Sequence, residues 1–286
     1  MSRFTSVMVV ALAGGAAFAG SGGCGRLAFD LLGHEPSDAQ PGDDAAPDAT
    51  PADVTSRCAV LLHMDEAAWI DHGSGSGSVR AAVTPTDLVN ACDAANPGLA
   101  SGSASPVDDP IRGMVGRFDA NTCVQIKDEV PTRATTAVTT SAWIKMMGDP
   151  AGSFGVVSKR VSAGSGEEYD MFVWTGSRVY ADIDSEDDRF SGRGTLPTGV
   201  WTQLTMVYDG AQLPAARVRI YVDGVLDTIG GETSARITQS GSPLSIGCLP
   251  LGGIAQSFEG ELDDVAVWTR ALTDRDVAAW YAMTRR

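Results

Sequence analysis

The chain has 286 residues, of which 43% are apolar and 20% charged, so it is long enough for one large or two small domains and too apolar for general disorder. Its 36 acidic and 21 basic residues give a formal net charge of −15, and no dense run of Lys or Arg interrupts this acidity. Nucleic acids and anionic membranes are held by basic surfaces, so the charge excludes both as partners. The 33 glycines and 14 prolines indicate a turn-rich, mostly β protein.

Residues 1–23 have the pattern of a signal peptide. One arginine precedes an apolar stretch over residues 7–19, which is shorter than the roughly 20 residues that a membrane-spanning helix needs. Two cleavage positions are open. Ala17-Phe18-Ala19 satisfies the small-x-small rule for cleavage after Ala19, whereas SGGC at 21–24 resembles a bacterial lipoprotein box that would make Cys24 the new N-terminus.

Residues 24–57 are predicted to form a disordered tether. The part from 34 to 57 is rich in Pro, Ala and Asp, and it holds six acidic residues and one arginine. Such a segment has little to bury and repels itself, so we expect it to stay extended. It carries −5 of the net charge, which leaves the remaining domain at 58–286 only moderately acidic.

The odd number of cysteines, five, also indicates an exported domain behind an N-terminal tether. An exported protein keeps its thiols paired, and Cys58, Cys92, Cys123 and Cys248 form an even set for two disulfides, leaving Cys24 as a candidate for lipidation. Four cysteines allow three pairings, of which Cys58–Cys92 with Cys123–Cys248 is preferred. We expect an exported protein, at the bacterial outer membrane or cell surface if it is a lipoprotein and otherwise periplasmic or secreted.

From residue 58 onward, short stretches of alternating apolar and polar residues are separated by Gly, Asp, Pro and Ser. This spacing predicts a β-sandwich or jelly roll. The predicted strands are 79–83, 123–126, 139–145, 171–176, 178–184, 201–208, 216–224, 243–247 and 261–268. Asp223-Gly224 favours the positive φ angles of a tight hairpin turn.

One helix is predicted after Thr273. Thr273 is a suitable N-cap and Asp276 stands at the third helical position, as in a capping box. The helical spacing places Val277, Trp280 and Tyr281 on one face, which we expect to pack on the sandwich.

Several motifs follow in the order found in laminin-G-like domains of the concanavalin A-like superfamily. They are HMDE (63–66), GMVGRFDANTCVQI (113–126), SAWIK (141–145), VVSKR (156–160), WTQLTMVYDG (201–210), VRIYVDGVL (218–226), PLSIG (243–247) and FEGELDDVAVWTRALTDRDV (258–277). The chain from about 61 to 281 therefore resembles this family, although Ala120 stands where the family usually has glycine. The resemblance implies an all-β concanavalin A-like jelly-roll sandwich with one short C-terminal helix.

Large aromatic residues fall on or beside the predicted strands. We expect Trp143, Trp201, Tyr221, Phe258 and Trp268 to fill the core between two sheets. Trp174 and Tyr180 lie on neighbouring strands and are candidates for stacking on a sugar ring.

The residues needed for catalysis are largely missing. Glucanases of the superfamily carry E-x-D-x-x-E on one strand, and the corresponding residues here are Glu261, Asp263 and Ala266, so the second carboxylate of the pair is absent. Outside the tether the histidines are His63 and His72, and no serine has the surroundings of a nucleophile elbow. The sequence therefore predicts no catalytic residues.

Calcium is the one cofactor that the sequence makes worth considering. The acidic run 182–188 offers oxygen ligands, but it lacks the turn glycine of an EF-hand and is interpreted as a solvated acidic edge. Pentraxins are distant relatives on the same fold, and Gln256 resembles one of their calcium-binding positions, with Glu168 or Asp170 near another. The acidic loop between these positions is replaced by Cys248-Leu249-Pro250, so any such site is expected to be weak.

The sequence thus predicts a non-catalytic module that binds a glycan or an extracellular protein, with a membrane contact only through its N-terminal lipid. Two alternatives stay open. One is a glycoside-active enzyme using carboxylates from separate strands, such as Asp182, Asp184 and Glu168. The other is a structural envelope protein without a small ligand.

Overall fold

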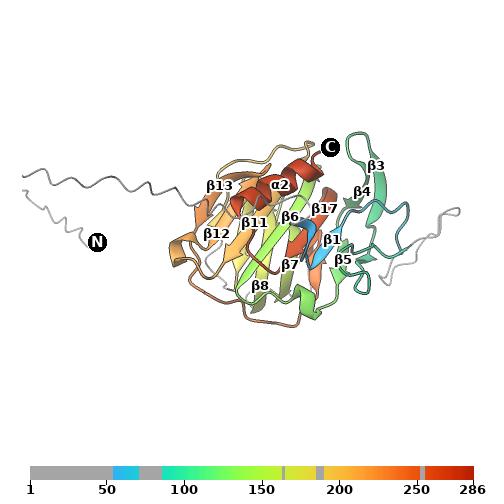
Figure 1. Cartoon of the computed structure of the whole chain (residues 1–286). Coiled ribbons are helices and arrows are strands. Elements are labelled where there is room, and N and C mark those ends of the chain that lie inside the picture. Colours follow the sequence, from blue (N-terminus) through green and yellow to red (C-terminus); the bar gives the residue numbers. More distant parts are fainter. Residues whose placement is uncertain (1–53, 71–85, 163–164, 185–189, 252–254) are drawn as a thin grey trace, which may run out of the picture. The chain divides into compact units, whose positions relative to one another are not determined.

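The computed structural model describes residues 54–70, 86–162, 165–184, 190–251 and 255–286, and these form a two-layer β-sandwich with one helix on its outside (Figure 1). The signal peptide, Cys24, His72 and the predicted strand 79–83 lie outside the described residues. The first described residue, Val54, precedes the expected domain start at Cys58 and is already buried. No helix in the described ranges is long and apolar enough to cross a membrane.

The first layer is an eight-stranded antiparallel sheet in the order β13-β12-β11-β6-β17-β4-β3, with β1 paired to the second half of β17. Its strands are β1 (Val60–Leu62), β3 (Ser105–Asp109), β4 (Gly113–Phe118), β6 (Ala137–Met146), β11 (Thr202–Asp209), β12 (Val218–Val222), β13 (Val225–Gly230) and β17 (Gly260–Trp268). The sequence neighbours β6 and β7 lie in different layers, as a jelly roll requires.

The second layer is a seven-stranded sheet in the order β10-β9-β8-β7-β14-β5-β2. Its strands are β2 (Leu99–Ser101), β5 (Cys123–Ile126), β7 (Phe154–Ser162), β8 (Ser165–Trp174), β9 (Arg178–Ile183), β10 (Phe190–Ser191) and β14 (Leu244–Ile246). A small pair, β15 (Cys248–Pro250) and β16 (Ala255–Ser257), lies against β7, and two short 3-10 helices, η1 (Val130–Thr132) and η2 (Pro214–Ala216), lie in the connections.

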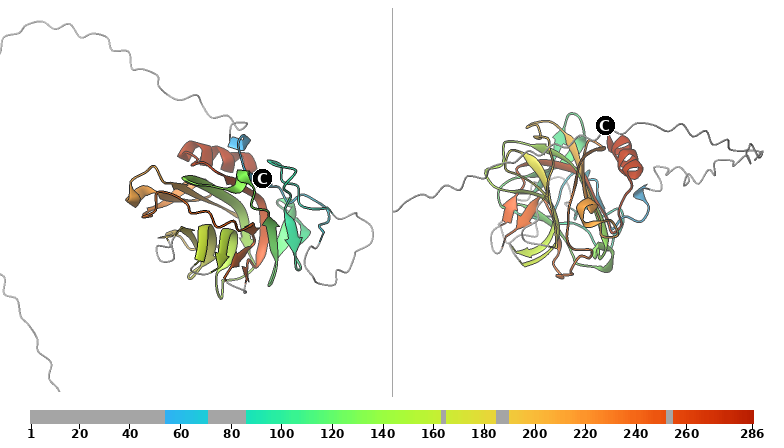
Figure 2. Two further views of the ribbon diagram at one scale, coloured as in Figure 1. Left: turned by 90° about the horizontal axis from the view of Figure 1, so that it is seen from below. Right: turned by 90° about the vertical axis from the view of Figure 1, so that its left-hand side faces the viewer.

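The main core lies between the two sheets, which face each other in Figure 2. Alternate residues of each strand enter it, so that Ile144, Met146, Met171, Val173 and Leu262 are all essentially inaccessible to solvent. Burying side chains of this size contributes about 1.5–3 kcal/mol each, which makes this core the main source of stability.

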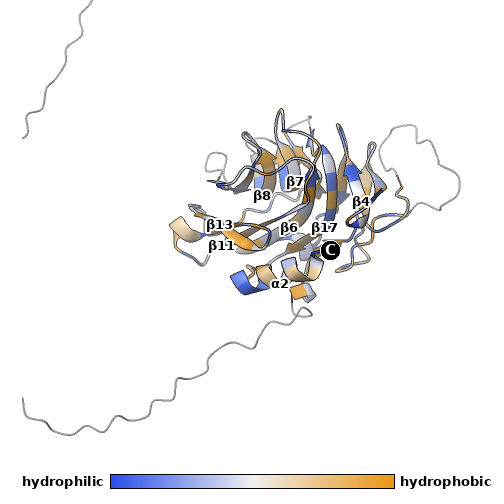
Figure 3. Cartoon of the chain, turned by 90° about the horizontal axis from the view of Figure 1, so that it is seen from above, coloured by the Kyte–Doolittle hydropathy of each residue, from blue (hydrophilic) through white to orange (hydrophobic). Residues whose placement is uncertain are grey.

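The helix α2 (Asp274–Thr284) covers the outer face of the eight-stranded sheet (Figures 2 and 3). It begins as predicted: the Thr273 side chain accepts from the Asp276 backbone N–H at 3.1 Å, and Asp276 accepts from the Thr273 N–H at 3.0 Å. Its residues Val277 and Trp280 are buried against the sheet, and Trp280 Nε1 donates to Ser141 Oγ at 3.1 Å. Helix and sheet together enclose a second apolar cluster.

This second cluster corrects the expected position of several aromatic residues. Phe258 lies in the core between the sheets as predicted, but Tyr221 and Trp268 lie in the cluster under α2. Trp143 also faces the helix and stacks on Tyr281 with ring centres 5.6 Å apart. Trp201 is only half-buried, and its Nε1 donates to Asp109 Oδ1 at 3.1 Å. Side chains alternate between the two faces of a strand, so the sequence shows which residues share a face but not which face a helix covers.

The chain enters the described domain on the helix side. Val54 belongs to the cluster under α2, and its carbonyl accepts from Trp268 Nε1 at 2.8 Å. The hairpin β12–β13 forms where it was predicted, because Asp223 and Gly224 have φ angles of 51° and 73° and join the paired residues Val222 and Val225.

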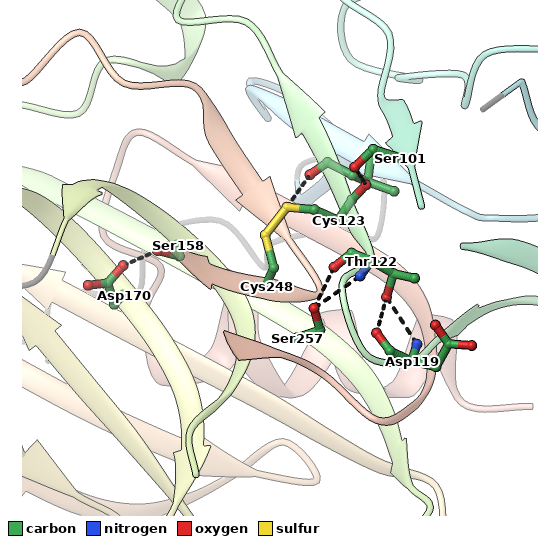
Figure 4. Close-up of a disulfide and its surroundings, with 9 residues drawn as sticks. Ser101, Asp119, Thr122, Cys123, Ser158, Asp170, Cys248 and Ser257 are labelled. Atoms are coloured by element: carbon green, nitrogen blue, oxygen red, sulfur yellow. Dashed lines mark hydrogen bonds between the residues drawn. A yellow bond between two sulfur atoms is a disulfide. The ribbon is translucent and has the colours of Figure 1, made fainter. Parts of the chain in front are cut away.

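Both disulfides have the preferred pairing. Cys58–Cys92 and Cys123–Cys248 have Cα–Cα distances of 5.7 and 5.3 Å. The second joins β5 to β15 (Figure 4), and Ser257 Oγ next to it donates to the Thr122 carbonyl at 3.0 Å. Strand β15 lies so close to β7 that a Cβ atom on Gly155 would stand 2.2 Å from the Cys248 carbonyl carbon. Only glycine therefore allows this contact.

Most other predicted strands are present with shifted ends. The strand predicted at 171–176 is the second half of β8, which begins at Ser165, and the strand predicted at 216–224 shortens to Val218–Val222. The sequence did not predict β1, β2 and β10, which have only two or three residues and cannot show alternation, nor β3. It also did not predict strands at β4 and β7, although both contain family motifs.

Candidate functional site

An aromatic face lies on the outside of the seven-stranded sheet, and we define it by Phe172, Trp174 and Tyr180. Their strand neighbours Met171, Val173 and Val179 point into the core, so alternation along β8 and β9 turns the three rings outward. Tyr180 stacks on Phe172 at 5.6 Å and meets Trp174 edge-on at 5.5 Å. Phe172 is buried, whereas Trp174 and Tyr180 are half-buried. The structure thus brings the two predicted sugar-stacking residues together.

Carboxylates continue the same outer face along β8 and β9. Asp170 is fully buried, receives a hydrogen bond from Ser158 Oγ (Figure 4), and forms an ion pair with Arg160 Nη1 at 2.8 Å. Arg160 also pairs with Glu167, and Asp182 lies opposite Asp170 in the strand register. Burial raises the pKa of Asp170, against the opposing effect of Arg160 and Ser158. Asp170 and Glu167 are thus held in place by Arg160, and Asp170 also by Ser158.

Glu168 points elsewhere. A bulge in the pairing of β7 and β8 lies beside it, and its Oε1 accepts from Lys159 Nζ at 2.9 Å and from Ser240 N and Oγ at 2.8 and 2.7 Å. Lys159 is fully buried and also contacts Asp128 Oδ1 at 2.7 Å. Burial acts to raise the pKa of Asp128, but hydrogen bonds from Lys159 and Arg133 lower it.

The three residues predicted as calcium ligands therefore have three different environments. Glu168 is occupied by Lys159 and Ser240, Asp170 by Ser158 and Arg160, and Gln256 Oε1 accepts from the Ser153 N–H at 2.8 Å. Among the residues that the structure describes, no group of three or more His, Cys, Asp or Glu side chains is arranged to hold a metal ion.

The carboxylates considered for an enzyme are also separated by their partners. Asp184 Oδ1 accepts from the Thr238 N–H at 2.8 Å, whereas Glu168 accepts from Lys159, and Asp182 lies on the outer face opposite Asp170. Asp184 and Glu168 are thus each held by a partner of their own.

On the other sheet, Glu261 and Asp263 lie on the helix side of β17. Glu261 pairs with Lys145 at 2.9 Å and with Arg117 at 3.4 Å. Ala266, which stands where glucanases have their second acid, is buried in the cluster under α2. The helix thus covers the position that a sugar would have to reach.

A buried ionic cluster next to this strand was not foreseen. Arg112, from the turn between β3 and β4, donates to Asp263 Oδ2 at 2.6 Å and to Asp264 Oδ2 at 2.7 Å. His63 Nδ1 lies 2.7 Å from Asp264 Oδ1, and this hydrogen bond raises the pKa of His63. Burial and the charge of Asp264 raise the pKa of Asp263 to about 7, although Arg112 opposes them.

His63 and Asp264 are paired as the histidine and aspartate of a hydrolase triad are, but the contacts of the cluster connect structural elements. Arg112 Nη1 also donates to the Thr284 carbonyl at 3.2 Å, which ties the end of α2 to β17. In the described part of the chain, no serine hydroxyl forms a hydrogen bond with His63. The sequence signal for this cluster was the HMDE motif, whose histidine is the one that contacts Asp264.

Comparison with known families places this fold. A family model of the concanavalin A-like lectin/glucanases superfamily, of the laminin G type, matches residues 118–278, which is more than half of the chain. The chain belongs to this laminin G family. The resemblance seen in the sequence motifs is therefore confirmed. A comparison with curated proteins finds no match.

Solved structures with a similar fold include binding domains of botulinum neurotoxins. The type C toxin structure described with two ganglioside molecules has a TM-score of 0.56 at 11% identity, covering 83% of this chain and 53% of that chain. The serotype D ligand-binding domain in complex with N-acetylneuraminic acid has a TM-score of 0.54 at 9% identity, covering 82% and 52%. The DC toxin binding domain in complex with rat synaptotagmin II has a TM-score of 0.52 at 10% identity, covering 80% and 52%. This laminin G chain spans about half the length of these toxin fragments, and the likeness is one of fold.

Proposed function

We propose that this laminin G chain is a non-catalytic binding module that recognises a glycan through the aromatic face of its seven-stranded sheet. The observation that supports this most directly is the pair Trp174 and Tyr180, two half-buried rings held edge-on at 5.5 Å on an outward face. Aromatic rings held in this way offer a flat apolar surface together with a polar edge, which suits the alternating apolar and hydroxylated faces of a sugar.

The surroundings of these rings favour binding over hydrolysis. Retaining and inverting glycosidases need two carboxyl groups about 5–10 Å apart on either side of the scissile bond. The acids that continue the aromatic face, Asp170 and Asp182, lie opposite each other on β8 and β9 and are both buried, and Asp170 is paired with Arg160. The toxin domains of similar fold are described with gangliosides, N-acetylneuraminic acid or synaptotagmin, which also supports a recognition role.

The proposal includes export and anchoring. We propose that residues 1–23 are removed and that Cys24 carries the lipid, so that residues 24–53 tether the domain to a cell surface. The pairing of all four cysteines in the domain supports this, because it leaves Cys24 as the cysteine without a partner in the sequence count. Mass spectrometry of the mature protein tests it: an acylated N-terminal Cys24 is expected, and a chain that begins at Gly20 contradicts it.

Glycan-array binding of the full chain tests the recognition role. Wild type is expected to bind at least one glycan, and Trp174→Ala is expected to lower that affinity about tenfold or more, because truncating an aromatic anchor of a binding surface costs about 2 kcal/mol. Tyr281→Ala is the matched control, since Tyr281 is also half-buried but lies on the helix side. Release of reducing sugar would instead support the enzyme alternative, and binding of no glycan with capture of a purified extracellular protein would support a protein ligand.

A further inference from the structure

Lys159 is a buried nucleophile that the proposed function leaves unused. The chain has three lysines, of which Lys127 is exposed, Lys145 is half-buried and Lys159 is completely buried. Lys159 lies on β7 opposite Tyr169, which belongs to the core between the sheets and whose pKa is raised by burial. An ammonium group at this position is therefore stabilised by its protein partners and not by water.

Two carboxylates are those partners. Lys159 Nζ lies 2.7 Å from Asp128 Oδ1, in the connection after β5, and 2.9 Å from Glu168 Oε1 on β8. An ammonium group has three N–H donors, and within the described ranges these two oxygens are the acceptors that it contacts. The nitrogen thus touches two carboxyl groups, each with a carbon that a neutral amine can attack.

The contacts of Asp128 suit the carboxyl group that is attacked. Its second oxygen, Oδ2, accepts from Arg133 Nε at 2.9 Å and lies 2.8 Å from Arg133 Nη2. Arg133 follows directly after η1, so this short helix brings the guanidinium group back onto Asp128. When the carboxyl carbon becomes tetrahedral, negative charge develops on its oxygen, and a guanidinium group fixed at that oxygen stabilises it.

Glu168 has the contacts of a proton carrier. Besides Lys159, its Oε1 accepts from Ser240 N and Oγ at 2.8 and 2.7 Å, so the side chain is held in one position. Its other oxygen, Oε2, is buried and has no hydrogen-bond partner among the described residues. A buried carboxylate oxygen without a partner keeps a lone pair that can accept a proton from the adjacent amine.

We propose that Lys159 and Asp128 form an intramolecular isopeptide bond, with Glu168 carrying the proton. The ion pair becomes reactive when one Nζ proton moves to Asp128, which leaves a neutral amine beside a carboxylic acid. Nζ then attacks Cγ of Asp128, and Glu168 takes a second proton from Nζ and passes it to the departing hydroxyl oxygen. The C–O bond breaks, one water leaves and an amide remains, so the step uses no further reactant. Holding the two groups in contact replaces an encounter in solution.

Lys145 offers a comparison within the same chain. Its Nζ lies 2.7 Å from Asp109 Oδ2 and 2.9 Å from Glu261 Oε2, which are the same two distances as at Lys159. However, the Lys145 side chain is 20% exposed, and the hydrogen bond to Asp109 raises its pKa. Water and carboxylates therefore keep Lys145 as an ammonium ion, which has no lone pair for attack. The cross-link is expected at Lys159 and not at Lys145.

The bond would connect the two layers of the sandwich. Asp128 and Lys159 are 31 residues apart, and the chain between them contains β6, which lies in the eight-stranded sheet. Lys159 itself lies on β7 in the seven-stranded sheet. A covalent link at this place closes a loop that runs through both sheets. The proposal does not depend on what the domain binds.

Peptide mapping of the full chain tests the proposal. Trypsin does not cut after an acylated lysine, so the digest is expected to contain a branched peptide in which residues 128–133 are joined to residues 146–160. Its mass is expected to be one water below the sum of the two peptides, and fragmentation locates the bond. Cleavage after Lys145 is expected to proceed normally.

Variants assign the roles. Glu168→Gln keeps the size and an oxygen acceptor for Ser240 but removes the carboxylate that takes the proton, so the branched peptide is expected to disappear. Glu167→Gln is the matched control, because Glu167 is the preceding residue and also buried but pairs with Arg160, and it is expected to retain the branched peptide. Thermal unfolding of both variants checks the fold.

The wild-type digest decides the proposal without any variant. A linear peptide 146–159, cut after Lys159, together with an unmodified peptide 128–133 overturns it and identifies the cluster as an ordinary buried ion pair. A cross-link from Lys159 to Glu168 also overturns it, because Glu168 would then be the group attacked. A branched peptide that persists in Glu168→Gln overturns the role given to Glu168. Glycan binding is unaffected by any of these results.

Discussion

The guanidinium carbon of Arg112 lies 4.3 Å from the centre of the Trp143 ring. The same guanidinium binds Asp263 and Asp264 on the last strand and the Thr284 carbonyl at the end of the helix. Arg112 is almost completely buried, so its charge is compensated by these hydrogen bonds and not by water. One side chain thereby connects the β3–β4 hairpin, β17 and α2.

Replacing Arg112 is expected to destabilise the protein strongly. Arg112→Met keeps much of the side-chain volume but leaves the buried Asp263 and Asp264 without their closest counter-ion, with only Arg286 at 3.8 and 3.9 Å and, for Asp264, His63. Breaking such a buried pair costs about 3–5 kcal/mol of the free energy of unfolding. Urea unfolding followed by tryptophan fluorescence measures this. Arg117→Met is the control, because the Arg117 side chain is 39% exposed and its pair with Glu261 spans 3.4 Å, so a loss below about 1 kcal/mol is expected. Similar losses in both variants would contradict the role given to Arg112.

The His63–Asp264 contact predicts a pH-dependent contribution to stability. The pKa of His63 is raised in the folded protein by the hydrogen bond to Asp264, so the folded state binds the proton more tightly than the unfolded state does. The stabilisation is complete below the unfolded pKa of about 6.5 and is lost as the pH rises through the higher folded value.

Comparison with His63→Gln isolates this contribution. The free energy of unfolding of wild type minus that of His63→Gln should be larger at pH 5.5 than at pH 8.5. Repeating the comparison in an Asp264→Asn background should reduce the pH dependence of that difference, because the hydrogen bond to Asp264 is the largest cause of the raised pKa of His63. A difference that is constant across this range, or that grows with pH, would show that the contact carries no protonation linkage.

The two disulfides are expected to contribute unequally. Cys123–Cys248 joins residues 125 apart in sequence and Cys58–Cys92 residues 34 apart. In the chain-entropy account, closing these loops stabilises the folded state by about 5 and about 4 kcal/mol, respectively. Double Cys→Ser variants at each pair, compared by chemical unfolding, should therefore both be destabilised, with the larger loss for Cys123 and Cys248. The reverse order would indicate that local packing outweighs loop length.

Gly155 is expected to tolerate no side chain. A Cβ atom there would lie 2.2 Å from the Cys248 carbonyl carbon and 2.3 Å from the Leu249 nitrogen, so Gly155→Ala must displace β15 from β7. Hydrogen exchange of the amides of Cys248 and Leu249 and of residues 255–257 is expected to accelerate in this variant. Gly148→Ala is the control, since no atom lies within 4 Å of the corresponding Cβ position. Unchanged exchange in Gly155→Ala would mean that β15 has room to adjust.

Local chemistry explains which features could be predicted from the sequence. The Asp223-Gly224 turn and the Thr273–Asp276 cap depend on residues a few positions apart, and both formed as predicted. Arg112 and its partner Asp263 are 151 residues apart, so only the fold brings them together. The positions of Trp143 and Trp268 could not be assigned to a layer, because alternation does not reveal which face of a sheet a helix covers.

The candidate site shows the same division. Trp174 and Tyr180 could be identified as neighbours because they lie on either side of a short turn. The predicted calcium ligands Glu168 and Asp170 were separated by a bulge, which turns adjacent side chains toward different partners.

The hydrogen bond between Trp268 and Val54 has a mechanical consequence. The chain enters the domain against the helix layer, whereas Trp174 and Tyr180 face outward from the other sheet. Under the proposed anchoring at Cys24, a pull along the N-terminal segment would be carried by the helix side, and a ligand bound as proposed would load the opposite side. Force between the two would pass across the sandwich through the core between the sheets, and the proposed ligand surface is separate from the side on which the chain enters the domain.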